Sequence, residues 1–224
     1  MFMRQIAAIF IKDLKSEWRT REVFMSMFVF AVLVVVVFNF AIGADPELMR
    51  QVAPGVLWVA LLFATVLGLQ RAAQMEHEDE CLSGVLLGMG DRSALFIAKT
   101  AGNMLYLLLI TLCTLPPFSV WFRINILSNI IPLSVVLLLG MLGFSAIGTL
   151  FSIITLNTRT REIMLPLLFL PISVPLTIAS VYATANLVVG KGLSDITDYL
   201  TLMGVFDIVF LVTALLVFDV IVEE

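Results

Sequence analysis

The sequence predicts an all-α polytopic membrane protein, in which six transmembrane helices follow one amphipathic helix on the membrane surface. Its 224 residues are 61% hydrophobic and only 13% charged, whereas a soluble domain has roughly a quarter of its residues charged. A span needs about 20 mainly apolar residues, and the chain has room for six of them with short loops. Residues 29–38 form a continuous apolar run, which excludes the alternating pattern of a β-barrel strand.

Residues 1–22 predict the interfacial helix. Apolar side chains recur every four residues at Phe2, Ile6, Phe10, Leu14 and Trp18, and basic residues occupy much of the remaining surface. This pattern is typical of a helix in the headgroup region of an anionic leaflet. A secretory signal peptide is the alternative. However, the basic region is too long, and the apolar run that follows is longer than the apolar region of a signal peptide, which has about 7–15 residues.

Six spans are predicted at 23–43, 52–69, 93–120, 130–156, 163–189 and 200–222, within a single membrane domain of residues 1–224. A short polar loop with Asp45, Pro46, Glu47 and Arg50 is expected between the first two. Residues 70–92 form the longest polar interruption after the N-terminus and contain five of the seventeen acidic residues. They are predicted to be a loop between two spans.

Lysine and arginine residues predict the orientation of the chain. If the N-terminus is cytoplasmic, ten of the thirteen lie on the cytoplasmic side and only Arg50, Arg123 and Lys191 lie outside. Positively charged loops remain preferentially in the cytoplasm. Both termini and residues 70–92 are therefore expected to be cytoplasmic.

Motifs for catalysis are absent from the sequence. It has no G-x-x-x-x-G-K-[ST] phosphate loop and only one histidine, so a nucleotide site of that kind, a zinc motif and a conventional catalytic triad are excluded. His77 and Cys81 are four residues apart and could share a helical face as metal or haem ligands; a solvated loop histidine is the alternative. The sequence thus predicts no enzymatic activity, no metal site and no bound cofactor for this chain, and no nucleic-acid partner.

Polar groups within the spans are candidates for function, because burying them in lipid is costly. Asp207 lies either within the last span or at its interfacial end, and both positions are open. Asn39 and Asn103 are expected to form interhelical hydrogen bonds. Small residues of the fourth span predict a face for close helix packing, namely Ser145, Gly148, Thr149 and Ser152.

The fifth span contains three prolines, each of which removes a backbone hydrogen bond and can kink a helix. This span therefore predicts a pathway or hinge element, with a simple packing kink as the alternative. Together with Asp207, the candidate residues are Pro166, Pro171, Ser173, Pro175 and Thr177.

Residues 74–87 can form a short amphipathic helix. Its apolar residues are Met75, Leu82, Val85 and Leu86, and its acidic residues are Glu76, Glu78, Asp79 and Glu80. The acids cluster near the helix N-terminus, where the helix dipole favours them. An acidic, partly apolar helix suits docking to a basic groove on a soluble partner; a solvated connector is the alternative.

The order of these elements resembles the permease of a type-2 (ABC-2-type) ABC exporter. More narrowly, the chain resembles the CcmB-type permease of the cytochrome c maturation haem exporter. Three motifs carry the resemblance: APGVLW at 53–58, DRSALF at 91–96 followed by Lys99, and LLFLPISVPL at 167–176. The polar segment departs from the family pattern, with Glu80 in place of the usual glycine and Ser83 in place of the usual glutamate.

The resemblance implies a homodimer in the bacterial inner membrane, together with two copies of a soluble ABC ATPase subunit (CcmA-like) that binds ATP. The acidic and apolar residues of 74–87 would couple that ATPase to the spans. The complex would export haem or release a haem-loaded chaperone. A haem-handling membrane subunit (CcmC-like) would belong to the assembly. The alternatives are an ion-coupled secondary transporter that uses Asp207, and a non-transporting membrane scaffold of a haem-handling complex.

Overall fold

The computed structural model describes residues 2–43, 45–78, 93–155 and 161–221. These residues form helices and turns without any strand, and six of the helices are long and apolar enough to cross a membrane. The prediction of an all-α polytopic membrane protein with one additional helix is confirmed. The helices are α1 (Phe2–Thr20), α2 (Glu22–Ile42), α3 (Pro46–Glu78), α5 (Ser93–Trp121), α6 (Ile130–Thr155), α7 (Arg161–Val188) and α8 (Thr197–Ile221), with short 3-10 helices η1 (Ile126–Asn129) and η2 (Leu193–Ile196).

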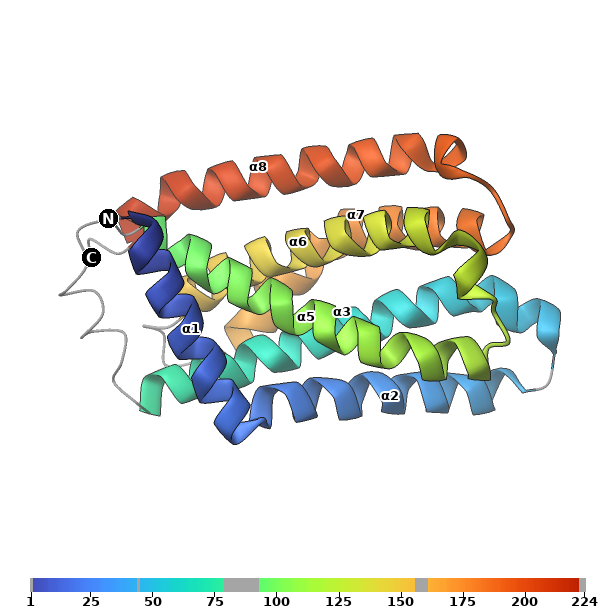
Figure 1. The fold of residues 1–224 in the computed structure, drawn as a ribbon, viewed down its shortest axis with the longest axis horizontal. Coiled ribbons are helices and arrows are strands. Elements are labelled where there is room, and N and C mark those ends of the chain that lie inside the picture. The colour runs from blue at the N-terminus through green and yellow to red at the C-terminus, as the bar shows by residue number, and fades with distance from the viewer. Residues whose placement is uncertain (1, 44, 79–92, 156–160, 222–224) are drawn as a thin grey trace.

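The six long helices lie side by side, and α1 crosses one end of the bundle (Figure 1). The direction changes at Arg21, whose left-handed φ of 57° separates α1 from α2. Ile9 of α1 belongs to a buried apolar cluster that also contains Leu95 and Phe96 at the start of α5 and Ala214 near the end of α8. We call this the α1 end of the bundle. The opposite end, with the two 3-10 helices, is the η1 end.

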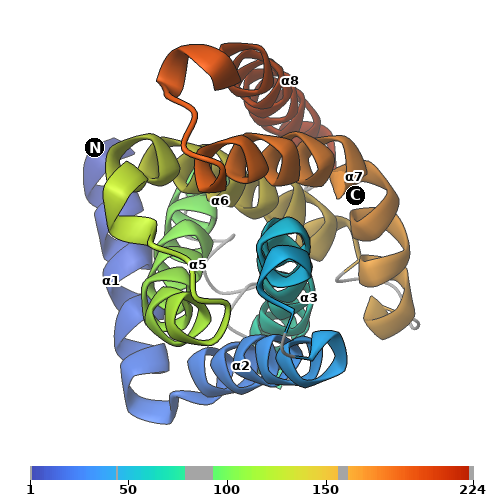
Figure 2. The ribbon, with the colours of Figure 1, turned by 90° about the vertical axis from the view of Figure 1, so that its right-hand side faces the viewer.

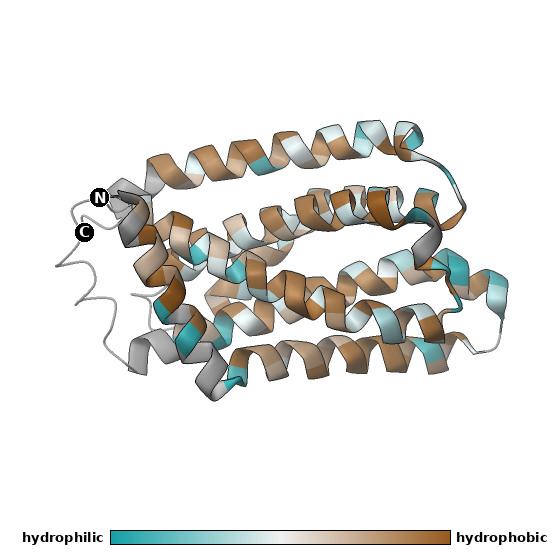
Figure 3. Cartoon of the chain, in the orientation of Figure 1, coloured by the Kyte–Doolittle hydropathy of each residue, from teal (hydrophilic) through white to brown (hydrophobic). Residues whose placement is uncertain are grey.

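The centre of the bundle is α3, and α8 and α2 lie at its periphery. Seen along the helix axes, α3 is surrounded by α2, α5, α6 and α7 (Figure 2). The hydrophobic span of α3 is 72% buried, whereas those of α2 and α8 are only 22% and 17% buried. Apolar residues cover the spans along most of their length (Figure 3), so the outer faces of α2 and α8 are suited to contact lipid.

The observed helix ends differ most from the predicted spans at the two ends of α3. The loop predicted around Asp45 is shorter, because Pro46, Glu47 and Arg50 already belong to α3. Asp45 accepts hydrogen bonds from the backbone N–H groups of Glu47 (3.0 Å) and Leu48 (3.3 Å), and proline is favoured in the first helical turn. At its other end α3 continues to Glu78, so the polar segment begins as a direct extension of the second span.

Candidate functional site

The carboxyl group of Asp207 is buried within α8. The side chain is 2% exposed, and neither of its oxygens has a hydrogen-bond partner in the part of the chain that the structure describes. Asp207 lies ten residues after Thr197, the first residue of α8, which is about 15 Å along the helix. The sequence allowed Asp207 to lie either within the last span or at its interfacial end. In the structure it lies within the span.

The carboxyl group of Asp207 occupies the space that a side chain at Gly143 of α6 would fill. A Cβ atom at this position would overlap both Oδ1 of Asp207 and a methyl group of Leu176 in α7. The absence of a side chain at Gly143 therefore allows α6, α7 and α8 to meet at one point. Since α6 has no charged residue along its whole length, it supplies no counter-ion to the carboxyl group.

Next to this point, Trp58 joins α3 to α6 and α7. Its indole Nε1 donates a hydrogen bond of 2.9 Å to the hydroxyl oxygen of Thr184. Its six-membered ring lies against Gly140, where a Cβ would overlap it. It also packs edge-on against Phe144, with the ring centres 6.0 Å apart. Trp58 is fully buried, so this hydrogen bond supplies the partner that a buried indole N–H requires.

The inner face of α7 carries hydroxyl groups at Ser173, Ser180 and Thr184, all of them buried. Each donates to a carbonyl oxygen of its own helix: Ser173 to Leu170 (3.0 Å), Ser180 to Leu176 (2.8 Å) and Thr184 to Ser180 (2.8 Å). Such bonds satisfy the hydroxyl protons inside the span and leave the oxygen lone pairs available. The result is a polar stripe that passes the position of Asp207.

The prolines of α7 lie on a different face. Pro171 and Pro175 are exposed and Pro166 is half-buried, whereas Ser173 is buried. Thr177 is half-buried and donates to the carbonyl oxygen of Ser173 (2.8 Å). The structure thus places Ser173 and Asp207 in the interior and turns two of the three prolines outward. A role of these residues in a pathway or hinge stays a prediction.

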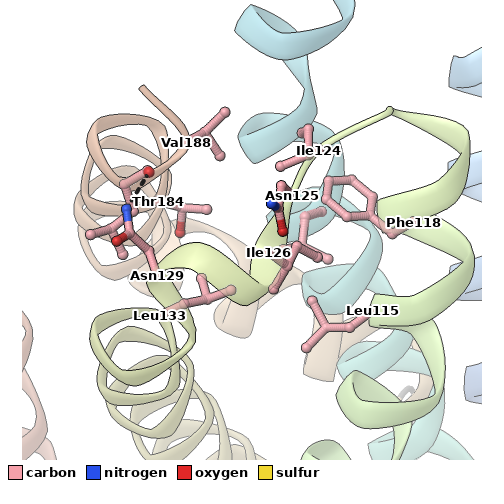
Figure 4. Close-up of a pocket in the computed structure, with 11 residues that line it drawn as sticks. Leu115, Phe118, Ile124, Asn125, Ile126, Asn129, Leu133, Thr184 and Val188 are labelled. Carbon is pink, nitrogen blue, oxygen red and sulfur yellow. Dashed lines mark hydrogen bonds between the residues drawn. The ribbon is translucent and has the colours of Figure 1, made fainter. Parts of the chain in front are cut away.

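A pocket opens at the η1 end of the bundle (Figure 4). Its wall is mainly apolar, and Asn129 closes one side by donating to the carbonyl oxygen of Leu187 (2.9 Å). Thr184, the partner of Trp58, also lines this pocket. The other lining residues are Leu57, Leu115, Phe118, Ile124, Asn125, Ile126, Leu133 and Val188.

Comparison with known proteins assigns the family of the chain. The sequence model of the family described as "CcmB protein" matches residues 4–222. The chain belongs to the CcmB protein family. It is 29% identical over 185 residues to "Heme exporter protein B" of Haemophilus influenzae, which covers 81% of this chain and 82% of that protein. The protein of the same name from Pseudomonas aeruginosa is 28% identical over 151 residues, 67% of each chain. That from Escherichia coli K12 is 25% identical over 200 residues, 88% of this chain and 87% of the relative.

Other polar residues of this CcmB family member act in helix packing, as predicted. The side chain of Asn39 donates to the carbonyl oxygen of Trp121 (2.9 Å), and that of Asn103 donates to the hydroxyl of Thr149 (2.9 Å). Ser145 donates to the carbonyl oxygen of Thr100 (2.5 Å). A Cβ at Gly148 would overlap Leu69. Ser145, Gly148 and Thr149 of α6 therefore form a close packing face with α3 and α5, while a part of Ser152 in this face stays a prediction.

The predicted coupling segment is described only in its first part. Met75, Glu76 and Glu78 belong to the last turn of α3, as does His77. The remaining predicted coupling residues lie outside the described residues: Asp79, Glu80, Leu82, Val85 and Leu86, together with Cys81. In the described ranges, no three His, Cys, Asp or Glu side chains gather closely enough to hold a metal ion.

Sequence reasoning missed the Trp58–Thr184 hydrogen bond and the pocket beside it. The sequence marks Trp58 only as part of the APGVLW motif at 53–58, and no pattern in it marks Thr184. One signal was present, because a tryptophan in the middle of a span requires an acceptor for its N–H group. Which of the many hydroxyl groups provides it depends on the packing of α3 against α7, which sequence alone does not determine.

Proposed function

We propose that this chain is the transmembrane permease subunit of an ABC transporter for cytochrome c maturation. ATP hydrolysis on a partner subunit would drive export of haem or release of a haem-loaded chaperone. The observation that carries this proposal is the match of the CcmB family over residues 4–222, joined by relatives named "Heme exporter protein B" that cover most of the chain. These relatives support haem as the cargo.

The need for an energy-supplying partner follows from the sequence, which has no phosphate loop of its own. We propose that a soluble ABC ATPase subunit (CcmA-like) docks on residues 74–87. The helix α3 supports this assignment, because it runs unbroken from the η1 end to Glu78. A push on its last turn would act on the helix at the centre of the bundle, which carries Trp58.

The proposed assembly contains two copies of this chain and two of the ATPase, with a haem-handling membrane subunit (CcmC-like) and a haem chaperone as further partners. It lies in the bacterial inner membrane with the α1 end in the cytoplasm. The basic residues of residues 1–22 support this orientation, since α1 lies at the same end as the last turns of α3 and α8 (Figure 1).

Co-purification tests the docking role. The double variant Leu82→Asp with Leu86→Asp is expected to lose the ATPase subunit during purification while still inserting into the membrane. A matched control changes two exposed leucines of the η1 end, Leu48→Asp with Leu193→Asp, and is expected to retain the ATPase. If the first variant keeps the ATPase at the level of the unchanged protein, residues 74–87 are not its docking site.

A second candidate is an ion-coupled secondary transporter, and the buried carboxyl of Asp207 favours it. This function predicts cargo transport by the chain alone in liposomes with an imposed ion gradient, and its loss in Asp207→Asn. Transport that requires the ATPase and ATP under the same conditions would decide for the permease.

A further inference from the structure

Asp207 has no partner of the kind that usually compensates a buried carboxylate. Both oxygens are buried without a hydrogen bond among the described residues, and Oδ1 lies in the space above Gly143, into which a methyl group of Leu176 also points. An ionised carboxylate that is buried without a partner is unfavourable, so such a group is normally neutralised or paired.

No charged side chain from the packed helices supplies a counter-ion. The charged residues of α7 are Arg161 and Glu162 in its first turn, and α6 has none. The remaining titratable groups on these and the other elements that pack on α8 do not hydrogen-bond to the carboxyl group. They are Lys12 and Lys15 in α1, Lys99, Tyr106 and Cys113 in α5, Tyr182 in α7, Asp195 in η2, and Asp198 and Tyr199 in α8. Asp219 is twelve residues beyond Asp207 in α8, which is about 18 Å along the helix.

A metal cation also fits the site poorly. Sodium-like and divalent cations require several oxygen ligands, whereas no group of three His, Cys, Asp or Glu side chains includes Asp207 in the described ranges, and Leu176, which packs at the same glycine, offers only carbon atoms. A proton needs only the carboxylate itself. We infer that Asp207 is a proton-binding site, and that the bound proton holds α8 against α6 at Gly143.

Because α8 lies at the periphery of the bundle, the bound proton would decide whether α8 stays packed against α6. We call this arrangement the latch. Loss of the proton leaves a charge against Gly143 and Leu176, and the charge is relieved when α8 moves outward and water enters. The span of α8 is only 17% buried, so such a movement breaks fewer contacts than it would for α3. Met203 lies one turn before Asp207, is fully buried, and contacts the Ser180 hydroxyl through its sulfur (3.8 Å). It therefore marks the interface that would open.

The polar stripe of α7 indicates the side from which water would enter. Thr184 lines the pocket at the η1 end, Ser180 lies one turn further in, and Leu176, one more turn in, is at the level of Asp207. In the closed bundle, Trp58 and Met203 occupy the space beside these hydroxyls. Opening of α8 would thus connect the pocket with the carboxyl group along α7.

Infrared spectroscopy of the full chain in lipid nanodiscs, with isotope-labelled aspartate, tests the proton. The carbonyl band of a protonated carboxyl group is expected at neutral pH and is expected to disappear in Asp207→Asn. Asp198→Asn, at an exposed position of the same helix, is expected to retain it. A missing band at neutral pH in the unchanged protein would overturn the inference, and so would a band that sodium chloride abolishes at constant pH.

Cysteine labelling tests the latch. Met203→Cys is introduced into a chain that lacks Cys81 and Cys113, and its alkylation rate by a small maleimide is divided by that of Leu193→Cys, which is exposed at the η1 end. This ratio is expected to rise about tenfold or more in alkaline buffer as the carboxyl group ionises, and to stay constant when Asp207→Asn is added. A ratio that is constant in both chains, or that rises in both, would refute the latch.

Both readouts use the purified chain without an ATPase. Failure of the proton site therefore leaves the proposed permease function untouched, and failure of ATPase co-purification leaves the proton site untouched.

Discussion

The indole nitrogen of Trp58 lies 2.9 Å from the hydroxyl oxygen of Thr184, which joins two helices across 126 positions of sequence. On one side of this pair the wall of the η1-end pocket begins. On the other side lie Gly140 and Ser180, followed by Gly143 and Asp207. The contact between α3 and α7 therefore connects the helix that leads to the predicted coupling segment with the polar interior.

A double-mutant cycle measures this contact. Trp58→Phe removes the indole donor but keeps an aromatic ring, and Thr184→Val removes the acceptor. The coupling between the two changes is expected to be about 0.6 kcal/mol, the average for interhelical hydrogen bonds in membranes. The measurement is the free energy of unfolding in mixed micelles. The bond between Thr184 and the Ser180 carbonyl is lost in both backgrounds and cancels, so additive effects would mean that the Trp58–Thr184 bond adds no stability.

The close approach of α8 to α6 depends on Gly143. Gly143→Ala places a methyl group where Asp207 and Leu176 now lie, so these helices must separate; overpacking of this kind typically costs about 1–3 kcal/mol. The matched control is Gly204→Ala in α8, since a Cβ there meets no atom within 4 Å. That variant is expected to be at least as stable as the unchanged chain, because alanine favours helices. Thermal unfolding compares the two.

Adding Asp207→Ala to Gly143→Ala extends this comparison. The second change removes the carboxyl oxygen that the new methyl group overlaps, so part of the lost stability is expected to return. No recovery at all would show that the overlap with Leu176 alone limits the packing.

The docking of α1 depends on Ile9. This side chain is buried between α5, α6 and α8, whereas Ile11 on the same helix is 49% exposed. Ile9→Ala is expected to cost about 2 kcal/mol or more of local stability, which would accelerate amide hydrogen exchange throughout α1 at least several-fold. Ile11→Ala is expected to change exchange little. Equal exchange in both variants would mean that lipid, not the bundle, holds α1 in place.

The sequence predicted most of the fold because each span is long and apolar enough to be recognised alone. The interhelical roles of Asn39 and Asn103 followed from the cost of leaving an amide unpaired in lipid, and hydrogen bonds to Trp121 and Thr149 confirm them. The position of Asp207 could not be decided, because span ends are uncertain by several residues. The role of Gly143 could not be predicted either, since it depends on which helix faces which.

The prolines of α7 provide the last test, which depends on the proposed function. Pro171 and Pro175 are exposed, so Pro171→Ala with Pro175→Ala removes little packing. It restores N–H donors for the carbonyl groups of Leu167 and Pro171, and thus stiffens the helix. If α7 is a hinge, maturation of c-type cytochromes in cells is expected to fall several-fold while the amount of inserted protein is unchanged.

The control for this variant is Pro132→Ala. Pro132 lies in the first turn of α6, directly after η1, so its replacement restores no hydrogen bond in the middle of a span and maturation is expected to remain normal. Normal maturation in the α7 double variant as well would show that the prolines only shape the packing of α7. In that case Ser173 and Asp207, which face the interior, would remain the candidates for a pathway.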